Sequence, residues 1–351
     1  MTTLITGADG YLGQRIAAAL SGEDLILAVR CADAAEFERK RARLAQVADA
    51  AVVPVDLRDA DPFAQLDPRR ITRIVHAAAV IRFDVDRDTA WRVNVAGTAR
   101  VRQYAERCDS LERLMLLSTL YTAGRRCGEV REVRHDDAGF VNYYEWSKWV
   151  AEECLLDAPE LPVTVVRLPT VITEDAAGEI GQYNAFHHTM RLYHSGLLTL
   201  LPGDPATPLS LATADFAIGA VTALLDAEPG IYQACSGPVA LGTAIDTAFT
   251  VFERDPVFQR RMLPRPIPCD RASFHDLAQA AQRLRGGPLR PALASVVPFA
   301  EQLYLPKRFQ ADRLRAAWPG HRAQDPVALV EAACTNLVRR SFRVPARTAA
   351  H

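Results

Sequence analysis

The fold is decided by a stretch near the start of the chain, residues 6–13, which reads TGADGYLG. A short apolar run precedes it and an amphipathic segment follows it. Gly7 permits a tight turn, Gly10 lets the backbone approach a pyrophosphate, and Gly13 lets the next helix pack close to the sheet. The N-terminus of that helix offers free N–H groups and a positive dipole to phosphate. A strand, a glycine loop and a helix in this order predict a dinucleotide-binding loop.

The first two-thirds of the chain continue this alternation of short apolar runs and longer amphipathic segments. The alternation predicts an α/β fold, a doubly wound parallel sheet of the Rossmann type with helices on both faces. The apolar runs are rich in Val, Ile and Leu without alternation, as strands covered on both sides should be. The expected strands are residues 3–6, 25–29, 52–55, 71–76, 114–118 and 163–168. The expected helices are residues 13–20, 34–48, 89–108, 143–156, 183–195, 214–225 and 326–340.

The pattern loosens after residue 168, where segments containing proline and glycine separate the helical stretches. We therefore expect a nucleotide-binding Rossmann domain over residues 1–168. Residues 169–351 should form a smaller, mostly helical substrate-binding region, with some strands returning to the main sheet.

Composition narrows the function classes. The 351 residues carry a net charge of −1, which argues against a nucleic-acid-binding protein. The first residues do not resemble a signal peptide, and no apolar run is long enough to span a membrane. The seven cysteines are scattered without a CxxC pair, which favours a reducing cytoplasm over a disulfide framework or zinc site. The cations are nearly all arginine, and the only lysines are Lys40, Lys148 and Lys307.

The end of the second strand indicates which nucleotide binds. Dinucleotide folds usually have an acidic residue there that binds the ribose hydroxyls, but this chain has Arg30. A guanidinium binds phosphate oxygens bidentately, so Arg30 favours the 2′-phosphate of NADPH over NADH. The cations at residues 39–41 would add charge. The alternative is that Arg30 is a solvated surface residue in an arginine-rich protein.

Two further strand ends should contact the cofactor. Asp56 and Leu57 follow the third strand and are placed to touch the adenine. The small residues 77–79 follow the fourth strand and would let the backbone lie against ribose and pyrophosphate. We expect His76, just before them, to be a packed, hydrogen-bonded residue and not an acid–base group.

Tyr144 and Lys148 form a YxxxK pair at the start of an expected helix, one turn apart and therefore on one face. A neighbouring ammonium should lower the pKa of a phenol towards the working range of a proton donor. Ser118 and Thr119 end the fifth strand, whose carboxyl end should open onto the ligand crevice. A hydroxyl there would hold a substrate carbonyl oxygen while Tyr144 protonates it. The pair could also be a coincidence, but the glycine loop and the hydroxyls favour a catalytic constellation.

Five segments together resemble the extended short-chain dehydrogenase/reductase superfamily. Within it they look most like fatty acyl-CoA reductases and the thioester-reductase domains of carboxylic acid reductases and peptide synthetases. The segments are TGADGYLG (6–13), VHAAAVIRFD (75–84), NVAGT (94–98), LLSTLYTAG (116–124) and, most specific, NYYEWSKWVAE (142–152). Residues 201–221 are similar to the stretch that closes the substrate side in those reductases. The resemblance covers about the first two-thirds of the chain.

The resemblance implies that Thr119, rather than Ser118, is catalytic together with Tyr144 and Lys148. It implies an accessory, mainly structural role for Asn94 in the active-site helix. It also places residues 168–170 by the nicotinamide, although Arg-Leu-Pro at 167–169 departs from the commoner Arg-Pro. The residues expected to contact the cofactor are Thr6, Gly7, Asp9, Gly10, Tyr11, Leu12, Gly13, Arg30, Asp56, Leu57, Ala77, Ala78, Ala79, Asn94, Lys148, Pro169 and Thr170.

The expected activity is NADPH-dependent reduction of a carbonyl, favouring an acyl thioester on coenzyme A or an acyl carrier protein. The product would be an aldehyde or, after a second hydride, an alcohol. Three other readings stay open: a sugar-nucleotide epimerase or dehydratase, a ketone or steroid dehydrogenase, and a non-catalytic NADP sensor. The arginines after residue 253 are either a solvated face or a site for phosphates of coenzyme A or an acidic carrier. These are Arg254, Arg260, Arg261, Arg265, Arg271, Arg283, Arg285 and Arg290. We expect no metal, since no ligand completes a zinc-like spacing around His187, His188 and His194.

Overall fold

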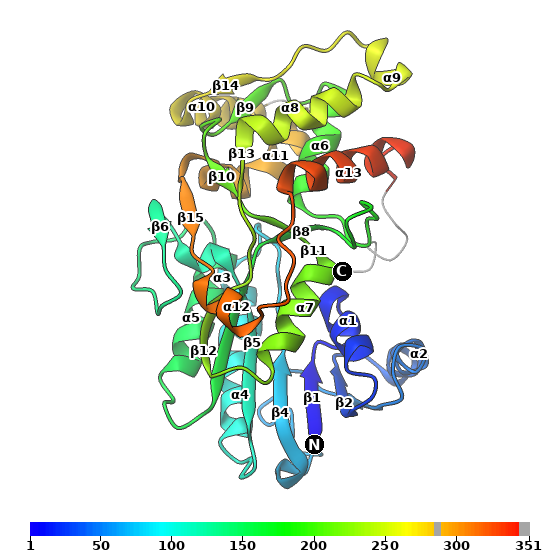
Figure 1. Cartoon of the computed structure of the whole chain (residues 1–351), viewed down its shortest axis with the longest axis vertical. Helices are drawn as coiled ribbons and strands as arrows, with labels where there is room; N and C mark the ends of the chain where they lie inside the picture. The colour runs from blue at the N-terminus through cyan, green and yellow to red at the C-terminus, as the bar shows by residue number, and fades with distance from the viewer. Residues whose placement is uncertain (284–288, 344–351) are drawn as a thin grey trace.

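The computed structural model describes residues 1–283 and 289–343 of the chain. Its centre is a sheet of seven parallel strands in the order β3-β2-β1-β4-β5-β7-β12. Figure 1 shows this sheet in the half of the molecule that contains the N-terminus. The strands are β1 (Thr2–Thr6), β2 (Asp24–Val29), β3 (Ala51–Pro54), β4 (Ile71–His76), β5 (Arg113–Thr119), β7 (Val163–Leu168) and β12 (Gly230–Gln233).

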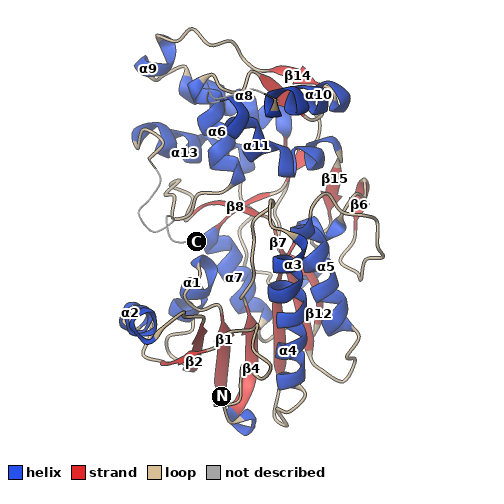
Figure 2. Cartoon of the chain, turned by 180° about the vertical axis from the view of Figure 1, so that it is seen from behind, coloured by secondary structure: helices blue, strands red, loops and turns tan. Residues whose placement is uncertain are grey.

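Helices cover both faces of the sheet, as Figures 1 and 2 show from opposite sides. One face packs against α1 (Tyr11–Ala19), α2 (Ala34–Leu44) and α7 (Ala214–Leu224). The other face packs against α4 (Ala96–Ala105) and α5 (Tyr143–Leu156). Buried aliphatic side chains fill both layers, which is why the strands read as continuous apolar runs.

The expected α/β fold is confirmed, and all six expected strands are present within one residue at either end. The seventh strand, β12, was not expected, because its four residues, GIYQ, are too short to give a pattern. The single helix expected at residues 89–108 is wrong in detail. It consists of α3 (Arg87–Ala90), the π-helical turn η2 (Trp91–Val95) and α4.

The second half of the chain adds a mostly helical layer beyond the carboxyl ends of the strands (Figure 1). It has its own apolar core, to which α6, α8, α11 and α13 contribute. Its helices are α6 (Ala185–Ser195), α8 (Leu241–Phe252), α9 (Pro256–Gln259), α10 (Arg271–Gln282), α11 (Leu289–Ala300) and α13 (Pro326–Arg339). The short helix α12 (Asp312–Ala317) instead returns to the main sheet, where it packs against α7 and β12. None of the helices in the described ranges is long and apolar enough to cross a membrane.

Four two-stranded sheets tie these layers together. Two of them join segments that are distant in sequence, namely β6 with β15 and β9 with β14. The other two are β8 with β11 and β10 with β13. The strands are β6 (Gly128–Val130), β8 (Thr170–Thr173), β9 (Leu200–Pro202), β10 (Pro208–Leu209), β11 (Leu211–Thr213), β13 (Val239–Ala240), β14 (Ile267–Cys269) and β15 (Lys307–Phe309). Short 3₁₀ turns are η1 (Pro68–Arg70), η3 (Leu120–Ala123) and η4 (Glu301–Tyr304).

A buried ion pair fixes α5 against the sheet. Arg167 of β7 is 0% exposed, and its Nη2 lies 2.6 Å from Oε2 of Glu152 on α5. Ser118, which lies opposite Arg167 in the strand register, donates a hydrogen bond of 2.5 Å to the same carboxylate. Because both charges are buried, removing either partner would leave an uncompensated buried charge and would strongly destabilise the fold.

We predict that Arg167→Met lowers the free energy of unfolding by about 3–5 kcal/mol, because it leaves the Glu152 carboxylate buried without a counter-charge. Replacing both partners, as in Glu152→Leu with Arg167→Met, should cost less than the single change. Urea denaturation measures both values. The control is Arg134→Met, which breaks an exposed pair with Glu153 on the same helix and should cost at most about 1 kcal/mol. Equal losses for the Arg167 and Arg134 variants would contradict the prediction.

Candidate active site

The candidate site lies at the edge of the sheet where β1, β4 and β5 end. In a parallel sheet this carboxyl edge opens onto the ligand crevice. Thr6, His76 and Thr119 are the last residues of these three strands. The Thr6 hydroxyl lies 2.8 Å from Nδ1 of His76, whose Nε2 lies 3.0 Å from the hydroxyl of Thr98. His76 is thus packed and hydrogen-bonded, and burial lowers its pKa to about 3, so it is neutral.

The glycine loop is held close to the residues that follow β4. Gly7 has a φ of +67°, and a Cβ on it would lie 2.7 Å from the Cα of Ala78. Two of the segments expected to contact the cofactor therefore meet. A Cβ on Gly13 would overlap the carbonyl oxygen of Gly7. Gly13 thus lets the start of α1 lie directly against the backbone of Gly7 and Ala8, which follow β1.

The N-terminus of α1 fits a phosphate. Gly10 is the N-cap of this helix, and no side chain of the described residues caps it. Its first N–H groups are therefore available to an anion. The Asp9 carbonyl oxygen is held by the side chains of Gln14 (2.6 Å) and Arg43 (3.1 Å), which fix the loop.

Arg30 lies exposed at the end of β2 and makes no ion pair with any residue that the structure describes. Its guanidinium is therefore available to an anionic ligand. Lys40 does not contribute free charge there, contrary to expectation. Its Nζ lies 2.8 Å from Asp9 and 3.0 Å from Glu36, and it donates to the Arg30 carbonyl oxygen at 2.5 Å. Lys40 thus joins the glycine loop to α2 and to the end of β2.

The residues that follow β3 and β7, which were expected to contact the cofactor, make contacts within the protein. The Asp56 carboxylate pairs with Arg58 at 2.5 Å. Leu57 is buried, and its carbonyl oxygen accepts a hydrogen bond from Arg100. Thr170, which follows Pro169 and begins β8, lies 3.2 Å from the hydroxyl of Tyr121.

Tyr144 and Lys148 lie one turn apart on α5, and both are buried. The helix begins beside the end of β5 because the Asn142 side chain caps it, accepting from the Glu145 N–H at 3.0 Å. The Tyr144 hydroxyl lies beside the Thr119 side chain, close enough for the two groups to interact. The Lys148 ammonium donates to the Leu117 carbonyl oxygen at 2.7 Å. Thr119, Tyr144 and Lys148 are thus brought together.

The electrostatics of this group differ from the expectation. Burial raises the pKa of Tyr144, and the neighbouring Thr119 side chain opposes that rise. Burial also lowers the pKa of Lys148 to about 8, against the attraction of Glu152. The expectation that Lys148 lowers the Tyr144 pKa is therefore wrong for this arrangement, in which the ammonium is directed at a backbone oxygen. The lysine, however, titrates close to neutral pH.

Ser118 and Thr119 have separate environments. Ser118 donates to Glu152 within the buried ion pair, whereas Thr119 contacts Tyr144. Of the two hydroxyls, only that of Thr119 lies beside the tyrosine. Alternating side-chain directions along β5 explain the separation.

Asn94 lies in the π-helical turn η2, and its side chain links two separate segments by hydrogen bonds. Its side chain bonds both backbone groups of Val80, at 2.8 and 2.9 Å, and donates to the Ser147 hydroxyl at 2.9 Å. The residues that follow β4 are thereby tied to α5. π-Helical turns are frequent at functional sites because they reposition a side chain.

Aromatic rings surround the Tyr144 side chain. The Phe83 ring lies 5.5 Å from Tyr144, 5.3 Å from Tyr121 and 5.9 Å from Phe299 of α11, measured between ring centroids. The rings come from both halves of the chain. They give the space beside Tyr144 an apolar wall.

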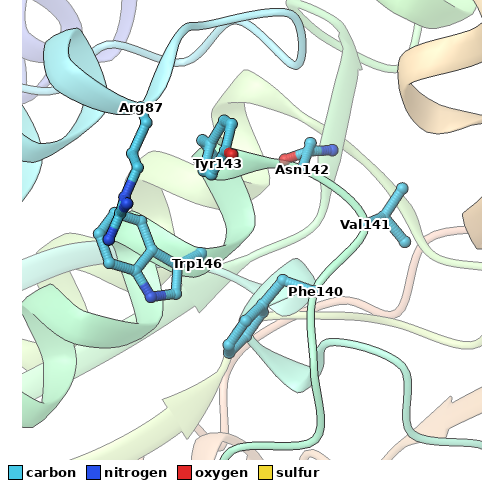
Figure 3. Close-up of a pocket in the computed structure, with 6 residues that line it drawn as sticks. All are labelled: Arg87, Phe140, Val141, Asn142, Tyr143 and Trp146. Carbon is cyan, nitrogen blue, oxygen red and sulfur yellow. The ribbon is translucent and has the colours of Figure 1, made fainter.

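A surface pocket of about 480 Å³ opens beside the start of α5 (Figure 3). Arg87 lies over the Trp146 ring at 5.7 Å and makes no ion pair within the described ranges. Tyr143 is 47% exposed. The pocket is lined by Arg87, Phe140, Val141, Asn142, Tyr143 and Trp146.

The arginines after residue 253 are less free than the sequence indicates. Arg254, Arg265 and Arg271 pair with acidic residues at 2.5–3.2 Å. Arg285 lies outside the described residues. His187 is buried at the N-terminal capping box of α6, and His194 lies 2.8 Å from Asp255. Within residues 1–283 and 289–343, no cluster of three or more potential ligands forms a metal site.

Sequence reasoning missed several residues around the site. The Glu152–Arg167 pair could have been suspected, because Glu152 lies one turn after Lys148 and Arg167 interrupts an apolar strand. Phe83 lies in a segment quoted for the family resemblance, but without a role. Phe299 comes from a part of the chain that showed no pattern.

Comparison with known proteins gives one family and several similar structures. A family model described as "Male sterility protein" matches residues 5–221. The terminal R domain of the myxalamid PKS-NRPS biosynthetic pathway is 20% identical, with a TM-score of 0.74, over 97% of this chain and 91% of that chain. A thiolation-reductase di-domain from an archaeal non-ribosomal peptide synthetase is 16% identical, with a TM-score of 0.73, over 97% and 76%.

An epimerase has a similar fold. UDP-glucuronic acid 4-epimerase from Bacillus cereus, in complex with NAD, is 14% identical, with a TM-score of 0.66, over 98% of this chain and 100% of that chain. At such identities these structures show the shared fold alone. The family model, in contrast, extends from β1 into α7 and includes both the glycine loop and the Tyr144 constellation. The chain belongs to the male sterility protein family, whose model describes an NAD-binding domain.

Proposed function

We propose that the protein is an NADPH-dependent reductase that delivers a hydride to a carbonyl group, with an acyl thioester as the preferred substrate. The observation that carries the proposal is the contact of the Tyr144 and Thr119 hydroxyls, one turn from the buried Lys148, at the carboxyl edge of the sheet. Family membership and the similarity of the fold to R domains support it. Residues 1–168 would bind the cofactor, and residues 169–351 would mainly bind the substrate.

The chain fits the cofactor at three places. The N–H groups of α1 suit a pyrophosphate, Arg30 suits a 2′-phosphate, and the buried Lys148 suits the nicotinamide ribose. When bound, NADPH would supply the hydride. Pro169 and Thr170 directly follow β7 at the same edge of the sheet, and the buried Asn94 holds Val80 in the segment that follows β4.

The residues of the chain would then stabilise the reaction on the substrate. Thr119 and Tyr144 would hydrogen-bond the carbonyl oxygen and stabilise the oxyanion that forms when the carbonyl carbon is reduced. Tyr144 would give its proton to that oxygen, and Lys148 would replenish the proton. With a thioester, the resulting hemithioacetal would collapse to an aldehyde and a free thiol. The aromatic wall around Tyr144 would exclude water.

A sugar-nucleotide epimerase is the second candidate, because structures of that class cover nearly the full chain. Arg30 at the end of β2 favours a 2′-phosphate and counts against an enzyme that binds NAD. The retained Tyr144 and Lys148 count against a non-catalytic sensor. A ketone or steroid dehydrogenase would differ only in its substrate.

The first prediction that follows from the proposed function concerns the cofactor. NADPH should bind more tightly than NADH, and Arg30→Ala should reduce the difference by about 1.5–3 kcal/mol, because it removes a charged hydrogen-bond donor. Fluorescence titration with both cofactors measures this. Arg69→Ala, an exposed arginine just before β4, is the control and should change neither affinity. Equal affinities of the wild-type protein for the two cofactors would refute the NADPH assignment.

The second prediction concerns proton transfer. Tyr144→Phe should lower kcat by about 10²-fold or more, as removal of a general acid does, and leave NADPH affinity nearly unchanged. Lys148→Met should lower kcat and also weaken NADPH binding. Steady-state kinetics and titration separate the two effects. Tyr143→Phe, the adjacent exposed tyrosine, is the matched control. Near-normal turnover by Tyr144→Phe would show that the catalytic assignment is wrong.

The third prediction concerns the substrate. Oxidation of NADPH should accompany release of one free thiol per acyl-coenzyme A or acyl-carrier thioester, and a thiol reagent measures that release. If both reduction steps occur, the corresponding aldehydes should also be reduced. Brisk turnover of a UDP-sugar or a simple ketone, without thiol release from any thioester, would favour the second candidate.

A further inference from the structure

The third lysine of the chain, Lys307, lies buried outside the proposed catalytic group. It begins β15 and is 5% exposed, in a protein whose other cations are nearly all arginine. Its Nζ donates to Oε1 of Gln302 at 2.5 Å. Nε2 of Gln302 in turn donates to Oε2 of Glu145 at 2.9 Å. A buried cation and a buried anion are thus joined through one amide.

Glu145 occupies a critical position on α5. It is 0% exposed and directly follows Tyr144. Besides Gln302, its carboxylate accepts from the Val141 N–H at 3.0 Å and from the Asn142 side chain at 3.3 Å. All three partners are donors, so the arrangement suits the ionised carboxylate. The same carboxylate therefore fixes the first turn of α5 and one wall of the pocket in Figure 3.

Further contacts join the same segment of the second half to the start of α5. Nδ2 of Asn142 donates to the Pro298 carbonyl oxygen at 3.0 Å. The next residue, Phe299, packs on Phe83, which packs edge-on against Tyr144. Residues 298–307 are therefore joined to the start of α5 by polar contacts with Asn142 and Glu145 and, through Phe83, by aromatic packing that reaches Tyr144.

We propose that Glu145 and Lys307, linked by Gln302, are positioning residues that hold residues 298–307 against the start of α5 and so place Tyr144 for proton transfer. The inference rests on the proposed function, since it assigns to Tyr144 the role of proton donor. Neither residue touches the reacting atoms.

The ionisable groups around Glu145 make the link between Glu145, Gln302 and Lys307 sensitive to pH. Burial raises the pKa of Glu145 to about 7. The hydrogen bonds from Val141 and Gln302 oppose this rise, and so do the positive charges of Lys307 and Arg125. Burial lowers the pKa of Lys307 to about 8. Besides burial, the negative charge of Glu145 in turn raises the pKa of Tyr121 and of Tyr144. Arg125 lies 3.6 Å from Glu301. As pH falls through about 7, Glu145 gains a proton and its three acceptor contacts weaken.

The test compares the pH dependence of kcat in the full-length wild type, Glu145→Gln and Lys307→Met. Wild-type kcat should fall as pH drops through about 7. Glu145→Gln should lack this acid limb and show a rate lower by about tenfold, within the range for coupled residues of one network. Lys307→Met should shift the limb to higher pH, because it removes a cation that lowers the Glu145 pKa. NADPH affinity should stay unchanged in both. Glu153→Gln on α5 and Arg308→Met on β15 are the matched controls.

A second readout needs no substrate. Amide hydrogen exchange of residues 298–307, corrected for intrinsic rates, should be faster in both variants than in their controls, and in the wild type below pH 7. Faster exchange with no reductase activity towards any carbonyl would refute the proposed function but support the link. Unchanged exchange, or variants that lower only the melting temperature and keep the wild-type pH profile, would overturn the inference.

Discussion

A buried ammonium group needs an oxygen acceptor, and this constraint organises the site. Lys148 is only 4% exposed, so most of the stabilisation of its charge must come from the protein. Its hydrogen bond to the Leu117 carbonyl oxygen attaches α5 to the C-terminal end of strand β5. Tyr144, one helical turn earlier, is thereby carried past the end of that strand, where Thr119 is the last residue. The contact between the two hydroxyls thus follows from where the lysine can be buried.

The same helix is fixed at two other levels, each by a buried carboxylate. One turn after Lys148, Glu152 binds Arg167 of the neighbouring strand, and at the start of the helix Glu145 accepts donors from residues 141, 142 and 302. The first carboxylate attaches α5 to the sheet, and the second attaches it to the helical layer. A helix held only by apolar packing could slide by a fraction of a turn. Directional bonds at three levels remove that freedom, and a proton donor must be placed to within fractions of an ångström.

Much of this was readable from the sequence because the information is local. Continuous apolar runs predicted six of the seven strands of the main sheet, and the four-residue spacing of Tyr144 and Lys148 placed them on one helix face. Two kinds of contact could not be predicted from the sequence. The first joins residues that are far apart along the chain, and the second engages a charged side chain that was expected to be free. The link from Lys307 to Glu145 spans more than 150 positions and leaves no periodic trace. Lys40, in turn, was expected to add free charge near Arg30, but nearby carboxylates engage it.

The three lysines of this arginine-rich chain occupy positions that an arginine would fit poorly. All three lysines make specific contacts: Lys40 with Asp9 of the glycine loop, Lys148 with the carbonyl oxygen of Leu117 in β5, and Lys307 with Gln302 of η4. An arginine would present a wide, planar group with five donors, too many to satisfy where a single backbone or amide oxygen is the main acceptor. A guanidinium also stays charged at any physiological pH, whereas burial brings both Lys148 and Lys307 to a pKa of about 8. Arg167, which is also buried, stays charged beside Glu152, whereas Lys148 and Lys307 provide buried cations that are compact and able to release a proton.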